Sequence, residues 1–312
     1  MPNVGSNPYE VELLTTQFTT RLDLLLQQKI SKLRGRCETG SHVGKQASPV
    51  QQIGVLSYAQ PAGRYAPVVP RIPQYTRRWV FPNDRDLTVL VDAFDELRTI
   101  VDPKGGISDA AAAAANRYFD DLIINAANGS ASTGVDASNL STESFDATNA
   151  LVADTFGASA STGMTYPKLV EGWRIMRHRQ VDLEAERPCV LYSSQQEADL
   201  KKQQEVISKE YGGSMAVVSG RVEMVAGFDA IVSERVNTSS SNSLRNCLAF
   251  VGSGIHLGLW KDVLTKVNER VDLTSHPWQL YSMISAGATR TQQFKVIQIN
   301  CADTTGFDPT AS

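Results

Sequence analysis

The chain has 312 residues, of which 42% are hydrophobic and 20% are charged, and its formal net charge is −3. A chain of this length is expected to fold as two domains or as one large discontinuous domain. The composition excludes a disordered polyelectrolyte and a fibrous repeat, and the small net charge excludes a global field that would recruit nucleic acid or an anionic membrane.

The first predicted element is one long helix over residues 9–34. It ends at Gly35, after Lys29, Lys32 and Arg34 have placed positive charge in the last turn, where the helix dipole favours it. Two interpretations remain open, an ordinary core helix and an arm that packs against a neighbouring chain. Apolar residues recur at helical spacing along it: Val11, Leu14, Phe18, Leu22, Leu25, Ile30 and Leu33.

Residues 35–88 suit neither a helix nor a compact core. Short extended pieces are predicted at 53–58, 65–69 and 77–81, and a structureless loop of this length is uncommon within a domain. We therefore expect a projecting hairpin that packs outside its own domain, with a meandering surface segment as the alternative. Prolines interrupt the region: Pro49, Pro61, Pro67, Pro70, Pro73 and Pro82.

A strand over 87–91 and a helix over 108–127 are predicted next. Ser108 is the expected N-cap, alanines occupy 110–115, and Asn128-Gly129 ends the helix. Alanine is the best helix former, and its short side chain lets other backbones approach closely. A long strut lying on a sheet is therefore predicted.

The second half of the chain is predicted to contain a βα unit. After a Ser- and Thr-rich segment, 129–164, in which we expect only short hairpins, a helix is predicted over 165–179 and a strand over 189–192. Ser194-Gln-Gln-Glu197 has the pattern of a capping box that opens a helix to about Glu210. Further strands are predicted at 215–218, 222–225, 228–232, 247–251, 257–260, 281–286 and 294–299, with a helix or strand at 263–271.

Motifs that carry catalytic chemistry are missing from the sequence. It has no hydrolase elbow, P-loop or HExxH, and the glycines at 212–213 and 252–254 lack GxGxxG spacing. Adjacent acids on a helix do not face each other, so Asp120-Asp121 and Asp92 with Asp95-Glu96 are expected to lie on solvated faces. We predict no catalytic, cofactor-binding or metal-binding residues. No pair of histidines has metal-ligand spacing, and each is expected to be structural or exposed: His42, His178, His256 and His276.

Basic residues cluster in two places. Arg174, Arg177, His178 and Arg179 lie near the end of the helix at 165–179, and Arg77-Arg78 stand beside Trp79 and near Tyr75. The second group could stack on and clamp a nucleic-acid backbone. The alternative, which we favour, has no nucleic-acid ligand. In this alternative the first group places charge at a helix C-terminus, and the second group lies in a loop that faces solvent or a neighbouring subunit.

Signals for membrane insertion and disulfide bonding are weak. The apolar stretch 247–260 is too short and too polar to span a bilayer, and the first residues lack the pattern of a signal peptide. The scattered cysteines favour an intracellular product with reduced thiols: Cys37, Cys189, Cys247 and Cys301.

The order of these elements resembles the major capsid protein of tailed bacteriophages, which has the Hong Kong 97-type fold. The order is an N-terminal arm, a Pro-rich extended loop, a strand, an Ala-rich spine helix, then helix, strand and helix. Local motifs are similar as well: Arg98-Thr-Ile-Val-Asp-Pro103, Asn116-Arg-Tyr-Phe-Asp-Asp-Leu-Ile-Ile124, Ala127-Asn-Gly129, Arg187-Pro-Cys-Val-Leu-Tyr192, Val225-Ala-Gly-Phe-Asp-Ala-Ile-Val232, Gly287-Ala-Thr-Arg290 and Lys295-Val-Ile-Gln-Ile299.

The resemblance implies an α+β fold and a structural, non-enzymatic role in an icosahedral shell around double-stranded DNA. It implies pentamers and hexamers of this chain in the virion, assembled in the host cytoplasm, with non-specific DNA contact and without a cofactor or membrane. Scaffolding, portal and decoration proteins are possible further partners. It divides the chain into an arm, 1–49, an extended loop, 50–88, a peripheral domain, 89–164, with its spine helix at 108–127, an axial domain, 165–260, and a return to the peripheral domain, 261–312.

Three other functions were weighed. An encapsulin-like compartment would share the fold and hold a different cargo, an enzyme would need a pocket with perturbed titratable groups, and a tail or decoration protein would lack the spine helix. Some relatives of this fold cross-link a loop lysine to a neighbour's asparagine, but residues 54–88 contain no lysine. We therefore expect a non-covalent shell, in which loop arginines pair with acidic residues of neighbours: Arg64, Arg71, Arg77, Arg78 and Arg85.

Overall fold

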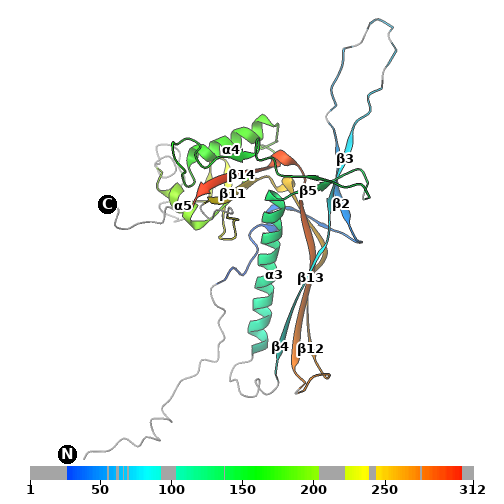
Figure 1. Ribbon diagram of the computed structural model, residues 1–312, viewed down its shortest axis with the longest axis vertical. Coiled ribbons are helices and arrows are strands. Elements are labelled where there is room, and N and C mark those ends of the chain that lie inside the picture. The colour runs from blue at the N-terminus through cyan, green and yellow to red at the C-terminus, as the bar shows by residue number, and fades with distance from the viewer. Residues whose placement is uncertain are drawn as a thin grey trace, which may run out of the picture.

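The described residues form a mixed α+β fold with a long helix and three β-sheets (Figure 1). A β-hairpin projects from one end of the molecule, and a narrow layer of long strands with the helix extends from the other. The computed structural model describes residues 27–54, 56–60, 63–65, 67–68, 70–92, 103–136, 138–203, 222–238, 244–274 and 276–303.

The long strands belong to a four-stranded sheet in the order β1-β12-β13-β4. β1 (Glu38–Ser41) pairs in parallel with β12 (Ile255–Glu269), whereas β13 (Trp278–Arg290) is antiparallel to both β12 and β4 (Asn83–Val91). The strand predicted at 87–91 is confirmed and begins earlier. The separate pieces predicted at 257–260 and 263–271 are one strand, whose register shifts on either side of Lys261.

Helix α3 (Pro103–Asn128) lies along this sheet and packs against β13, β12 and β4. The predicted strut is thus confirmed, but its expected N-cap is wrong, because the helix begins at Pro103 and Ser108 lies inside it. Proline is favoured in a first turn, where its missing N–H costs nothing. The end is as predicted: Gly129 donates its N–H to the carbonyl of Asn125 at 2.8 Å.

The alanines of α3 allow a test of close packing. Ala113 is buried, whereas Ala112 is exposed. We expect Ala113→Leu to lower the free energy of unfolding by about 1–3 kcal/mol through overpacking, and Ala112→Leu to change it by less than about 0.5 kcal/mol. Urea unfolding of the two variants measures the difference; equal tolerance at both positions would show that the helix does not pack tightly.

The largest part of the core surrounds a six-stranded sheet in the order β7-β14-β11-β8-β10-β9. Its central strand, β8, is buried along its whole length. The strand bounds are β7 (Leu151–Val152), β14 (Val296–Ala302), β11 (Leu244–Phe250), β8 (Cys189–Tyr192), β10 (Phe228–Val232) and β9 (Met224–Val225).

Strand β14 is the last described strand of the segment 261–312, for which a return to the peripheral domain is expected. β12 and β13 do lie in the sheet against α3, but β14 pairs antiparallel with β11 in the six-stranded sheet. Most of its residues are buried, and four of them belong to the core cluster: Val296, Ile297, Ile299 and Cys301. The chain therefore ends its described part in the sheet of β8.

Helices α4 (Tyr166–His178) and α5 (Ser194–Lys201) flank this sheet (Figure 1). The predicted order of strand β8 followed by helix α5 is confirmed. The capping box at Ser194 is wrong by one position, since Ser193 is the N-cap and no side-chain cap bond forms there. Residues 204–210 and the strand predicted at 215–218 lie outside the described residues. The described residues also form short 3-10 helices: η1 (Arg34–Arg36), η3 (Gly252–Gly254) and η4 (Gln293–Lys295).

The third sheet, in the order β2-β3-β5-β6, carries the projecting hairpin. β2 (Ala47–Ile53) and β3 (Tyr75–Val80) are antiparallel, which confirms a hairpin in the Pro-rich region. β5 (Ala131–Thr133) and β6 (Ser141–Glu143) form a short hairpin in the Ser- and Thr-rich segment and continue the sheet beside β3.

The helix predicted at 9–34 is wrong over its last residues. Residues 27–33 follow an irregular path, and the chain then makes the single turn η1. The reason is that a side chain of α3 takes up the backbone N–H groups of Lys32 and Leu33, which a helix would use itself. Residues 9–26 lie outside the described residues, as do the acids Asp95 and Glu96.

Candidate functional site

The projecting hairpin exposes large apolar side chains without cover from its own described chain. Scattered apolar residues are normal on a protein surface, but a series along one projecting element indicates a surface for a partner. Tyr58 is fully exposed and Tyr75 is more than half exposed. The exposed apolar residues of the hairpin are Ile53, Leu56, Tyr58, Tyr65, Val68, Ile72 and Tyr75.

The hairpin arginines make local contacts in the isolated chain. The Nη1 of Arg71 donates to the carbonyl and the hydroxyl oxygen of Ser57, at 3.0 and 3.1 Å. The Arg64 guanidinium lies 5.8 Å from the centre of the Tyr65 ring. Arg78 contradicts the expected pairing with neighbouring subunits, because its guanidinium is buried and forms an ion pair with Glu143 of its own chain.

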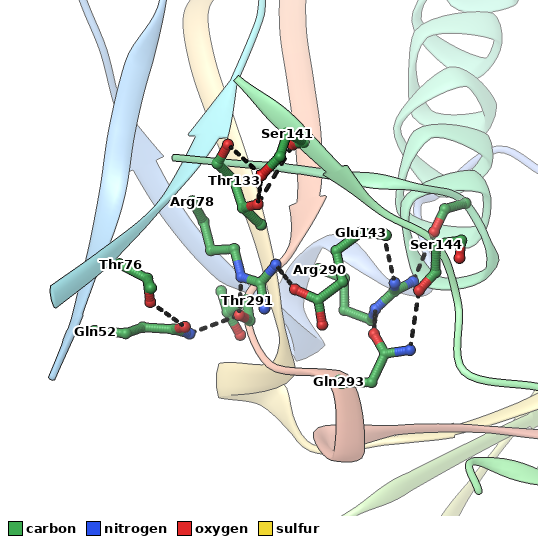
Figure 2. Close-up of polar contacts among 11 residues, drawn as sticks. Gln52, Thr76, Arg78, Thr133, Ser141, Glu143, Ser144, Arg290, Thr291 and Gln293 are labelled. Atoms are coloured by element: carbon green, nitrogen blue, oxygen red, sulfur yellow. Dashed lines mark hydrogen bonds and ion pairs between the residues drawn. The ribbon is translucent and has the colours of Figure 1, made fainter. Parts of the chain in front are cut away.

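Arg78 belongs to a polar cluster at the root of the hairpin, where β3, β6 and the end of β13 meet (Figure 2). Its Nε donates to the carbonyl of Thr291 at 2.8 Å, and the side chain of Gln52 on β2 donates to the same oxygen at 2.6 Å. The ion pair and this shared acceptor join the strands of the hairpin to the segment after β13. The cluster therefore sets the direction in which the hairpin leaves the molecule.

Arg290 is the centre of the same region and is 1% exposed. Its Nη1 donates to the carbonyls of Ala127 and Gly129 at the end of α3, at 2.8 and 2.7 Å. Its Nη2 and Nε reach the carbonyl of Glu143 and the side chain of Gln293 (Figure 2). Burial lowers the pKa of Arg290 to about 10, against the effect of nearby Glu143, so the side chain is still a cation at neutral pH. A cation at this position stabilises the C-terminal end of the helix.

Residues 31–33 of the N-terminal arm are fixed to α3 by a buried carboxylate. Asp120 is fully buried, and its oxygens accept hydrogen bonds from the Ser31 hydroxyl at 2.6 Å and from the N–H groups of Lys32 and Leu33 at 3.1 and 3.2 Å. The neighbouring Asp121 forms an ion pair with Arg235. The expectation that this acidic pair lies on a solvated face is therefore wrong.

The basic residues at the end of α4 are matched by acids of the same chain. Arg174 pairs with Glu171 at 2.6 Å and Arg177 pairs with Glu184 at 3.1 Å. The Arg179 guanidinium stacks 4.1 Å from the centre of the Phe294 ring. This arrangement favours the structural interpretation of the cluster over a dedicated polyanion site.

The histidines are arranged in a way that the sequence did not predict. His42 and His256, 214 residues apart, place their Nε2 atoms 3.0 Å from each other, whereas His178 and His276 are exposed. The cysteines of the described chain are free thiols, and burial raises the pKa of Cys37 to about 12. Among the described residues, no group of three or more His, Cys, Asp or Glu side chains could hold a metal ion. No helix of the described chain is long and apolar enough to cross a bilayer.

One family model matches most of the chain, and several solved structures share its fold. The family model described as phage capsid protein matches residues 12–303, and no curated protein matches the chain significantly. Among solved structures, the capsid of cyanophage P-SCSP1u is 15% identical with a TM-score of 0.73, and covers 93% of this chain and 94% of its own.

Two further capsid structures are similarly close. The capsid of Ralstonia phage GP4 is 14% identical with a TM-score of 0.68, over 97% of this chain and 98% of its own. The capsid of cyanophage Pam1 is 10% identical with a TM-score of 0.72, over 98% of this chain and 100% of its own. At these identities the likeness establishes the fold, and the family model establishes the family.

Proposed function

The chain belongs to the phage capsid protein family, and from this premise we propose that its hairpin and its arm hold copies of this chain together in an icosahedral shell around double-stranded DNA. The observation that carries the proposal is the series of exposed apolar side chains along the hairpin. A subunit of a virion capsid has a structural and not a catalytic role, which agrees with the absence of catalytic motifs from the sequence.

Interface physics supports the use of projecting segments. A stable interface buries roughly 1,200–2,000 Å², and each subunit of a closed shell needs several such interfaces. Identical subunits that contact each other head to tail close into rings around five- and six-fold axes. The hairpin offers apolar surface well outside the sheet against α3 and the six-stranded sheet (Figure 1). It can therefore extend over a neighbour without disturbing the core of either sheet. Contact with DNA in this proposal is non-specific, and scaffolding and portal proteins are further possible partners.

Electron microscopy of the purified full-length protein tests this function. Closed particles, in which the hairpin at 50–80 lies on a neighbouring subunit, are the expected result. Particles from infected cells should contain double-stranded DNA. This content distinguishes a viral shell from a compartment that holds protein cargo. A monodisperse monomer under all assembly conditions, or a hairpin folded back on its own subunit, contradicts the proposal.

The shell is expected to be held without covalent cross-links. Residues 54–88 contain no lysine, so the hairpin offers no amine that could attack an asparagine of a neighbour. Arginine remains protonated and is not a nucleophile in this setting. Denaturing electrophoresis of mature particles, boiled with reductant, should give a single band near 34.0 kDa. A ladder of oligomers that survives this treatment would show the expectation to be wrong.

A further inference from the structure

Two histidines face each other where β1 leaves the four-stranded sheet. The Nε2 atoms of His42 and His256 are 3.0 Å apart, so one ring donates its N–H to the other. His256, on β12, is 4% exposed, and its Nδ1 is buried without a hydrogen-bond partner. The rings are 5.2 Å apart between centres and tilted by 49°. Such a contact needs at least one neutral ring.

The surrounding sheet is shaped to fit these two rings. A Cβ atom at Gly40 would lie 2.9 Å from the His256 ring, and one at Gly258 would lie 2.8 Å from the His42 ring. The ring of Trp260 lies 5.4 Å from that of His42, and its Nε1 donates to the carbonyl of Gly44 at 2.6 Å. The glycines therefore make room for the pair, and Trp260 of β12 contacts the His42 ring from the same strand as His256.

The pair fastens a short connecting segment to the long sheet. β1 is an edge strand whose four residues pair only with β12 in the described sheet, and the N–H of His42 extends this ladder to the carbonyl of Leu259 at 2.9 Å. The same segment joins the end of the arm to β2, the first strand of the hairpin. Loosening residues 38–44 therefore frees the connection that leads into β2, while Gln52 still holds β2 to Thr291.

Acid weakens this contact. Burial, and then the neighbouring His42, lower the pKa of His256 to about 4, and burial also lowers the pKa of His42. A histidine in an opened segment titrates near 6.5. Above about pH 6.5 both states are neutral and the contact is intact. As the pH falls from there toward 4, the opened state binds protons that the closed state excludes, so closure is progressively disfavoured.

Other charged groups near the pair come from three elements. Glu38 lies beside His256 in the register of β1 and β12, and Lys45 follows His42 in the next turn. On β12, Lys261 follows Trp260. On β13, Thr289 stands opposite His256, and the adjacent Arg290 is occupied at the end of α3. Glu38 is the one acid among them, so the variant Glu38→Gln is used to measure its contribution to the pH dependence.

We infer that the His42–His256 contact is a proton-operated clasp, which holds residues 38–44, the segment that leads into the hairpin, on β12 at neutral pH and releases that segment in acid. The argument rests on the N–N contact, the burial of His256 and the edge position of β1, and it holds whichever molecule the hairpin contacts.

Hydrogen exchange of the full-length protein tests the clasp. After correction for the intrinsic exchange rate, protection of the amides in 38–44 should fall roughly 100-fold between pH 7.5 and 4.5. In His256→Gln, the fall should be less than about threefold, because an amide side chain does not titrate. In His42→Gln, the fall should be smaller than in the wild type but not abolished, because burial still lowers the pKa of His256. His178→Gln, an exposed control, should behave as the wild type, and Glu38→Gln should retain most of the pH dependence.

The fluorescence of Trp260 gives a second readout. Protonation of His42 at close range should change the emission between pH 7.5 and 4.5 in the wild type and not in His42→Gln, with Trp260→Phe identifying the signal. His42→Gln changes the more exposed partner, so it keeps the test available if His256→Gln does not fold. Equal protection of 38–44 at both pH values, or the same pH dependence in the wild type and both glutamine variants, would overturn the inference.

Discussion

Replacing Arg290 with methionine should lower the free energy of unfolding by about 3–5 kcal/mol, because at least two carbonyls lose their donor at a cost of about 1–3 kcal/mol each. The variant keeps the apolar stem and leaves the carbonyls of Ala127 and Gly129 without their donor. These acceptors are at the end of α3, so loss of the cation also removes a favourable charge from the helix C-terminus. The expected loss is a large part of the stability of an ordinary domain.

A matched control is available at the other end of β13. Arg270 pairs with Asp272 on the surface, and Arg270→Met should cost far less than Arg290→Met, because an exposed ion pair contributes little to stability. Arg290→Lys should lie between the two, because an ammonium keeps the charge but cannot reach acceptors on both sides as a guanidinium does. Urea unfolding of the unassembled subunit measures all three. A loss below about 1 kcal/mol for Arg290→Met would show that the buried cluster contributes little.

Regular elements could be predicted from the sequence where local signals agree. The alanines at 110–115 and the Asn128-Gly129 end identify α3, and the prolines between 49 and 82 identify the projecting hairpin. Boundaries were less predictable: Ser108 has the side chain of an N-cap, yet the chain enters the helix at Pro103. The strand pieces on either side of Lys261 look separate in the sequence because the register irregularity interrupts the alternation of one long strand.

The contacts that fix the hairpin and the arm could not be predicted, because they join residues far apart in the chain. Arg290 meets Ala127 across 163 positions, and His42 meets His256 across 214. Asp120 was expected on a solvated face because a helix pattern alone does not reveal that residues 28–33 cover it. Arg78 was expected to pair with a neighbour, and the sheet register that brings it to Glu143 became visible only in the fold.

Asp120 carries the second large effect that we expect. Asp120→Ala removes the acceptor of the Ser31 hydroxyl and of the N–H groups of Lys32 and Leu33. A buried donor left unpaired costs about 1–3 kcal/mol. Part of this cost is relieved if residues 28–33 detach from α3, because their N–H groups then bond to water. The variant should therefore lose about 3 kcal/mol of stability, and the end of the arm should detach from α3.

Asp121→Ala is the matched control, one position along the same helix. Its ion pair with Arg235 is about one-third exposed on both sides, so its loss should cost about 1 kcal/mol or less. Limited trypsin digestion separates the two variants, because trypsin can cleave after Lys32 only when the backbone of Lys32 and Leu33 is released from Asp120. We expect cleavage there to be at least tenfold faster in Asp120→Ala than in the wild type, and unchanged in Asp121→Ala. Equal cleavage rates in both variants would show that the buried carboxylate does not anchor the arm, and that the packing of Leu33, which is itself fully buried, is sufficient to hold it.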